Sequence, residues 1–120
     1  MMAQNQTSTS PKAGEIWDVF LDPTIGREQS GRRPVLVISN DWFNSREGQV
    51  VIAVPITGTE ARVRYQIEIP AGEGGKVKNS TILPEQVRAM DVARFKKRRG
   101  QVSPAVLQRV RGMVMMLITD

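Results

Sequence analysis

The sequence predicts a mainly β fold, a β-rich α+β domain in which a strongly curled antiparallel sheet of the small-barrel kind packs against a C-terminal helix. Two observations carry this prediction. Short apolar runs of strand length recur along the chain, separated by Pro, Gly and Asp. Apolar residues at helical spacing are sustained only near the C-terminus. The chain has 120 residues, enough for one domain, which we place at residues 14–120.

The first two strands are expected on either side of a polar loop. Residues 15–21 alternate in part between apolar and polar side chains, and Asp22–Pro23 ends this strand because both residues favour turns. The loop is expected at residues 25–32. Residues 34–39 then form a near-continuous apolar run, as expected for a central strand with Pro34 at its start.

The middle of the chain predicts a short helical turn and another strand. Asn40 or Asp41 is expected to cap one turn of helix that ends near Asn44. An apolar, β-branched run at residues 49–56 predicts a strand, and residues 58–62 predict a loop.

Two short strand regions and a basic stretch precede the C-terminal helix. Residues 64–69 alternate as in a half-buried strand, and residues 71–76 are a glycine-rich turn. Two strand-like pieces within residues 80–90 flank Pro84–Glu85. Residues 94–99 are strongly basic.

The C-terminal helix is marked by Ser103 as N-cap and Pro104 at the first helical position. Its apolar residues cover more of its surface than contact with one sheet requires. Gly112 lies in the middle of this helix, where glycine costs about 1 kcal/mol relative to alanine unless close packing compensates. These features favour a second covered surface, although a helix wrapped fully by its own barrel remains the alternative. The apolar residues are Val106, Leu107, Val110, Met113, Val114, Met115, Met116, Leu117 and Ile118.

Composition limits the chemistry. The chain has no Cys and no His, which excludes disulfides, thiolate zinc sites and the commonest general acid–base residue. A net charge of +5 favours an anionic partner such as nucleic acid, although a basic domain without such a partner is equally compatible. Residues 1–13 are polar and are expected to be a disordered tail. Because this tail has no apolar segment and no run in the chain could span a bilayer, we expect a cytoplasmic protein with no membrane association.

The polar loop concentrates groups suited to phosphate chemistry. Arginine can hold a phosphate through two parallel hydrogen bonds, and a carboxylate among arginines can accept a proton. A solvated charged turn is the alternative interpretation. The residues are Arg27, Glu28, Gln29, Arg32 and Arg33.

Several spaced motifs closely resemble the MazF/PemK family. GEIW at residues 14–17 is followed by LDPTIGREQSGRRPVLV at residues 21–37. PIT at residues 55–57, STILPEQVRAMD at residues 80–91 and the segment at residues 100–103 before the helix follow in the family's order.

This resemblance implies an SH3-like barrel of the PemK/CcdB type with a C-terminal helix. Members are sequence-selective endoribonucleases that cut single-stranded RNA by attack of the 2′-hydroxyl and leave a 2′,3′-cyclic phosphate and a 5′-hydroxyl. They form homodimers and are inhibited by a cognate antitoxin. The reaction needs a base, a proton donor and positive charge, and no metal or cofactor.

The resemblance also assigns roles to residues. Arg33 is expected to stabilise the phosphate, Thr57 to bind a phosphate oxygen, and Glu28 to act as base or to orient Arg33. Some members use an arginine at the position of Leu83 and an aspartate at that of Glu85, so this chain departs from them, and Glu85 is only a weak alternative base. Candidate RNA-binding residues are Arg27, Gln29, Arg32, Glu85 and Gln86.

Two further features and two other functions stay open. Trp42 and Phe43 are expected in the core, although an exposed ring there could stack an unpaired base. The basic stretch at residues 94–99 could extend an RNA groove or be a solvated face. A CcdB-like gyrase-binding toxin without nuclease activity is the main rival, and a non-catalytic RNA-binding barrel is another.

Overall fold

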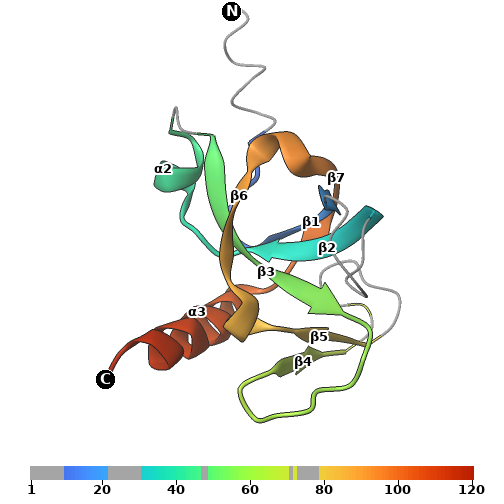
Figure 1. The fold of residues 1–120 in the computed structure, drawn as a ribbon, viewed down its shortest axis with the longest axis vertical. Coiled ribbons are helices and arrows are strands. Elements are labelled where there is room, and N and C mark those ends of the chain that lie inside the picture. Colours follow the sequence, from blue (N-terminus) through green and yellow to red (C-terminus); the bar gives the residue numbers. More distant parts are fainter. Residues whose placement is uncertain (1–9, 22–30, 47–48, 71, 73–78) are drawn as a thin grey trace, which may run out of the picture.

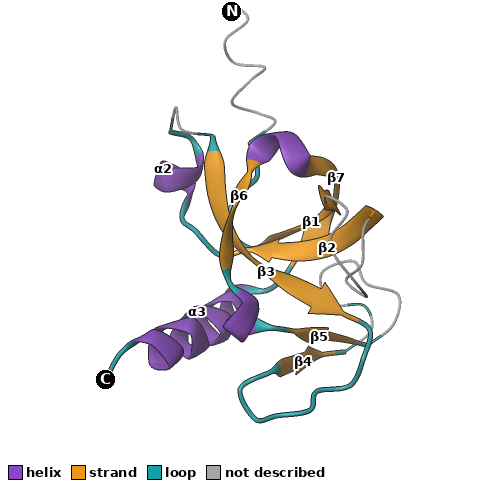
Figure 2. Ribbon diagram, viewed as in Figure 1, coloured by secondary structure: helices purple, strands orange, loops and turns teal. Residues whose placement is uncertain are grey.

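The expected fold class is confirmed by the structure, a computed structural model. The described residues form a seven-stranded antiparallel sheet and a C-terminal helix, α3, that lies across one side of it (Figure 1). Figure 2 shows that strands and loops make up most of the rest. The structure describes residues 10–21, 31–46, 49–70, 72 and 79–120.

The sheet has the strand order β4-β5-β3-β2-β1-β7, and β6 pairs with β3 outside this path. The strands are β1 (Glu15–Leu21), β2 (Gly31–Val37), β3 (Val50–Thr57), β4 (Ile67–Ile69), β5 (Ser80–Ile82), β6 (Arg88–Asp91) and β7 (Phe95–Gln101).

Strand β3 changes partner along its length, and this makes the sheet curl. Its first half, Val50 to Ala53, pairs with β6, whereas Ile56 and Thr57 pair with β5. The two short strands expected around Pro84 are therefore confirmed as β5 and β6, and they lie along different halves of the same neighbour. They are separated by η2 (Pro84–Gln86), a single 3-10 turn.

Strand β2 begins at Gly31, earlier than the expected start at Pro34. Pro34 pairs with Asp18 of β1, but β2 pairs with β3 only from Val35 onward. A proline is tolerated here because its missing N–H can face the side where no strand is paired. Arg32 and Arg33 therefore belong to a strand, although the sequence placed Arg32 in the loop.

Strand β4 is shorter than the alternation at residues 64–69 predicted. Ile67 and Ile69 are buried as expected, but the preceding residues form a turn instead of a strand. The Gln66 N–H donates to the Val63 carbonyl at 3.1 Å, and the Gln66 side chain accepts from the Arg62 N–H at 2.9 Å. Local side-chain bonds of this kind compete with strand pairing.

Two apolar clusters fill the domain. The larger cluster joins the sheet to α3 and includes Ile16, Leu36, Val54, Val110 and Val114. The smaller cluster has Val19, Val35, Ala53 and Met90 buried together, with Trp17, Leu21 and Phe95 packed against them. Because neighbouring residues of β2 and β3 alternate between these clusters, each strand is buried on both faces.

Both expected helices are present. In α2 (Asp41–Asn44), Asn40 is the N-cap and accepts a hydrogen bond from the Phe43 N–H. In α3 (Pro104–Ile118), Ser103 accepts from the Val106 N–H, as predicted.

The end of α3 is not covered by its own barrel. Val110 and Val114 face the core, but the last turn exposes a patch of four apolar side chains, called the α3 patch below. A Cβ atom added at Gly112 would meet nothing within 4 Å, so close packing against the described residues does not explain this glycine. The alternative of a fully wrapped helix is therefore wrong for this chain by itself. The α3 patch consists of Met115, Met116, Leu117 and Ile118.

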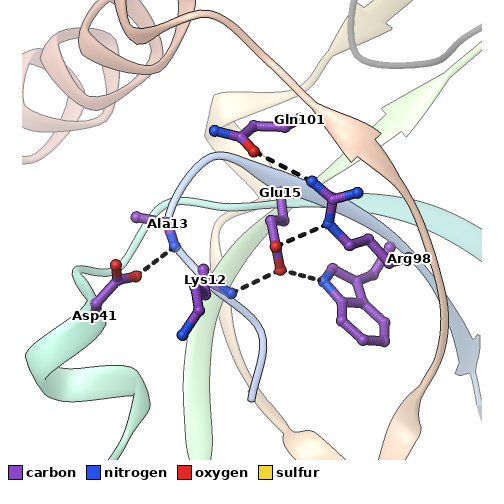
Figure 3. Close-up of polar contacts among 7 residues, drawn as sticks. Lys12, Ala13, Glu15, Asp41, Arg98 and Gln101 are labelled. Carbon is purple, nitrogen blue, oxygen red and sulfur yellow. Dashed lines mark hydrogen bonds and ion pairs between the residues drawn. The ribbon is translucent and has the colours of Figure 1, made fainter. Parts of the chain in front are cut away.

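A buried carboxylate fastens the start of the domain to the last strand (Figure 3). Glu15 accepts hydrogen bonds from the Lys12 N–H and the Trp17 indole N–H, each at 2.9 Å, and from Arg98 Nε at 2.8 Å. The Ala13 N–H donates to Asp41 at 2.7 Å. Most of the expected tail, residues 1–9, lies outside the described residues, whereas Lys12 and Ala13 contact the domain.

Among the residues that the structure describes, no helix has the length and apolar character needed to cross a membrane.

Candidate functional site

Arg33 lies on β2 and is half-buried, and its Cα is paired with that of Val19 on β1. Its Nε–H is buried and has no hydrogen-bond partner among the described residues. A buried donor without a partner costs about 1–3 kcal/mol, so nearly all such groups are paired in folded proteins. A guanidinium that keeps a donor unpaired is ready to bind an anion, and its planar fork matches phosphate.

Thr57 lies at the end of β3, where its hydroxyl belongs to a small threonine network. Its Oγ1 accepts from the Thr59 N–H at 3.3 Å and donates to the Thr59 hydroxyl at 3.3 Å. The hydroxyl of Thr81, a buried residue of β5, donates to the Thr59 carbonyl at 2.6 Å. Because a hydroxyl hydrogen bond of 3.3 Å is long, a ligand oxygen can replace the Thr59 hydroxyl as the acceptor of the Thr57 O–H.

The strand register brings Arg33 and Thr57 to the same end of the sheet. Val35 pairs with Pro55 at the last β2–β3 step, and Arg33 and Thr57 each lie two residues beyond this step. Both residues are on the strand face that carries Val35, because side chains alternate along a strand. Beyond Val35 the two strands diverge, since β3 turns to pair with β5 (Figure 1). The structure thus places an arginine and a threonine hydroxyl on either side of a fork between strands.

The structure describes three of the other six candidate residues. Arg32 is exposed on β2, next to Arg33. Glu85 and Gln86 are exposed on η2, which is tied to β3 because the Leu83 N–H donates to the Pro55 carbonyl at 3.0 Å. Glu85 accepts from Gln66 Nε2 at 2.8 Å, so this carboxylate is held in place by the β3–β4 loop. Arg27, Glu28 and Gln29 lie outside the described residues.

The aromatic residues of α2 differ from the expectation of a core position. Phe43 is half-buried, but the Trp42 side chain is 68% exposed, with the Arg46 guanidinium 4.5 Å from its ring centroid. The sequence was misleading because α2 has only four residues, too short to show a periodic apolar face.

The basic stretch divides between structural and free cations. Arg98 pairs with Glu15 at 2.8 Å, and Arg99 pairs with Asp18 at 3.5 Å. Lys96 is exposed and forms no ion pair within the described part of the chain. The Glu15–Arg98 pair was not foreseen, because 83 positions separate the two residues. Thr59 and Thr81 were also missed, since an isolated threonine in a strand carries no signal in the sequence.

Within the described residues, no group of three or more His, Cys, Asp or Glu side chains is arranged to hold a metal ion. The candidate site residues that the structure describes offer arginine, hydroxyl and carboxylate groups.

Comparison with known proteins gives both sequence and structural relatives. Residues 12–118 match the family described as PemK-like, MazF-like toxin of type II toxin–antitoxin system. The chain is 36% identical to endoribonuclease MazF9 of Mycobacterium tuberculosis, over 82% of this chain and 88% of that protein. It is 32% identical to endoribonuclease MazF of Staphylococcus saprophyticus, over 86% and 87% of the two chains. Its fold is similar to MazF in a MazE–MazF crystal structure from Deinococcus radiodurans, with a TM-score of 0.76 and 29% identity over 91% of this chain and 96% of that one.

Proposed function

Because this chain belongs to the PemK-like, MazF-like toxin family of type II toxin–antitoxin systems, we propose that it is a sequence-selective endoribonuclease that cleaves single-stranded RNA without a metal ion. The single observation that carries this proposal is the buried, unpaired Nε–H of Arg33, at the end of the sheet where β2 and β3 diverge. A structural arginine would satisfy this donor within the fold. A donor left unpaired is expected where a substrate phosphate supplies the partner.

The proposed reaction is attack by the RNA 2′-hydroxyl on the adjacent phosphorus. The new O2′–P bond closes a 2′,3′-cyclic phosphate while the P–O5′ bond breaks. A base takes the 2′-hydroxyl proton, and a proton is delivered to the departing 5′-oxygen to give a 5′-hydroxyl. DNA lacks the 2′-hydroxyl and cannot react in this way.

Three residues are proposed to divide this chemistry. Arg33 stabilises the negative charge that builds on the phosphate in the transition state, because an arginine guanidinium is positively charged. Thr57 donates its hydroxyl to a non-bridging phosphate oxygen. Glu28 is the proposed base, with Glu85 as the weaker alternative. The lack of His and Cys anywhere in the chain supports a mechanism without the usual transition-metal ligands.

Control of the activity is proposed to come from a cognate antitoxin. The similar Deinococcus radiodurans protein was solved as a MazE–MazF complex. The net charge of +5 on this chain favours an acidic segment as the inhibitor. Such a segment would place carboxylates near Arg27, Arg32 and Arg33, so antitoxin and RNA should compete. The site of action is then the cytoplasm, where cellular RNA is found.

We further propose that the active form is a homodimer. The α3 patch exposes four large apolar side chains in the last turn of a helix, and large exposed apolar surfaces mark interaction sites. A second copy of this chain would cover it.

The proposal is tested by incubating the purified protein with a long single-stranded RNA in excess EDTA. We expect discrete fragments from the wild-type protein and from an Arg109→Ala control, which removes an exposed arginine of α3. We expect none from Arg33→Ala. Binding without cleavage would favour a non-catalytic RNA-binding barrel, and an absence of both would contradict the proposal.

A further inference from the structure

An exposed aromatic side chain on β1, one position along the strand from the partner of Arg33, has no assigned role. Phe20 of β1 is 48% exposed, although phenylalanine is usually buried in a domain of this kind. It helps to line an open hollow of about 280 Å³ together with Asp91, Ala93, Arg94 and Lys96. It follows Val19, the Cα partner of Arg33, so its side chain lies on the opposite face of the β1–β2 pair from Arg33.

Cations surround this ring from both neighbouring strands. Phe20 is the Cα partner of Arg32, and side chains directly opposite in an antiparallel pair share one face of the sheet. On the other side, Arg94 Nη1 donates to the Phe20 carbonyl at 3.2 Å, and Lys96 lines the same hollow. Asp91 is the one carboxylate among the lining residues. One of its oxygens already accepts from the Ala93 N–H at 2.8 Å.

We infer that Phe20 is a stacking platform for one unpaired base of the RNA, with Arg32 and Lys96 binding the phosphates on either side of that base. This inference rests on the proposed endoribonuclease function and names a substrate subsite for it. An aromatic ring bordered by cations is how proteins hold single-stranded nucleic acid, because every base has a face that can stack. The free oxygen of Asp91 can accept a hydrogen bond from an exocyclic amino group, which favours a base that carries one.

Trp42 is the other strongly exposed aromatic residue in the described part of the chain, and it serves as the comparison. Arg33 lies near the start of β2, whereas Trp42 lies on α2, which comes after the end of that strand. Figure 1 shows α2 far from the start of β2. The four steps of β2 from Arg33 to Val37 alone span about 13 Å at a rise of about 3.3 Å per residue. Trp42 is also partnered by the Arg46 guanidinium.

The test uses a set of cleavable RNAs, each with one abasic nucleotide at a different distance from the cut site. For the wild-type protein, one position should show a loss of about 5- to 100-fold in kcat/KM, the usual effect of removing one stacked base. Phe20→Leu keeps an apolar side chain but lacks a ring. For this variant, the abasic nucleotide should no longer lower kcat/KM at that position, because no base is stacked there even in the intact RNA. Phe20→Tyr should restore it, and Trp42→Ala should leave it as in the wild type.

Three results would overturn the inference. If Phe20→Leu cleaves every RNA as the wild type does while Arg33→Ala is inactive, the platform is wrong and the proposed function stands. If no protein cleaves, an uncleavable RNA with 2′-deoxy substitution is used in fluorescence anisotropy, and equal affinities for wild type and Phe20→Leu refute the platform. A weaker affinity of Phe20→Leu for the antitoxin alone would assign the surface to protein instead of RNA.

Discussion

At the scale of single residues, Arg33 lowers the stability of the folded protein and is proposed to bind the substrate phosphate. Its buried Nε–H has no partner among the described residues, and this costs the folded state free energy that a phosphate would return on binding. Local violations of good hydrogen bonding are expected at functional sites.

Replacing Arg33 should therefore separate activity from stability. We expect Arg33→Ala to lower the RNA cleavage rate by about 100- to 1,000-fold, the usual effect of losing one transition-state donor. The melting temperature should stay the same or rise. Arg33→Lys should also be impaired, because an ammonium group cannot reproduce the two-pronged contact. Single-turnover kinetics and thermal unfolding on the same samples measure both effects.

A fully active Arg33→Ala protein would remove Arg33 from the site. An inactive protein that has also lost its cooperative unfolding would show a structural role instead.

The threonine network predicts a positioning role for Thr81. Thr81→Val keeps the shape of this buried side chain but removes its 2.6 Å hydrogen bond to the Thr59 carbonyl. With Thr59 no longer held, the hydroxyl of Thr57 should lose its orientation, and kcat should fall about 2- to 10-fold for a bond worth about 0.5–1.5 kcal/mol. KM should change little, and Thr81→Ser should restore kcat. Equal kcat values for wild type and Thr81→Val would contradict this role.

At the scale of elements, local sequence signals predicted where helices begin, whereas the pairing of distant strands could not be predicted. Ser103 and Pro104 mark the start of α3 because capping depends on neighbouring residues alone. The start of β2 was misjudged, because whether Pro34 is tolerated depends on where β3 stops pairing. The place of Arg33 and Thr57 at one fork likewise follows from strand register. Only the family resemblance brought these two residues together in the sequence.

Gly14 joins three elements and provides a test of the fold. Its φ is +87°, and its N–H and carbonyl bond to Val37 at 2.8 Å and Val102 at 2.9 Å. A Cβ there would be only 3.5 Å from the Leu107 side chain, an ordinary contact, so the cost of alanine arises from the backbone. We expect Gly14→Ala to lower the free energy of unfolding by about 1–2 kcal/mol in urea titrations. An unchanged unfolding midpoint would contradict this backbone geometry.

At the scale of the whole molecule, the exposed end of α3 and the proposed homodimer belong together. Ile118 is 69% exposed in the isolated chain. Ile118→Lys should therefore leave the unfolding of the single chain nearly unchanged but place a charge in the contact between copies. Light scattering at micromolar concentration should give about twice the 13.4 kDa chain mass for the wild type and about that mass for the variant. A wild-type monomer, or a variant that remains a dimer, would contradict this use of the α3 patch.

The central claim concerns how this family member cuts RNA, and mass spectrometry of the fragment ends tests it most directly. The wild-type protein is incubated with an RNA of defined sequence in EDTA, beside the same RNA with a single 2′-deoxy nucleotide at the cut site. Our account predicts 2′,3′-cyclic phosphate and 5′-hydroxyl ends from the first RNA and no cleavage of the second at that site. A 3′-hydroxyl end, or cleavage at the 2′-deoxy position, would contradict attack by the 2′-hydroxyl.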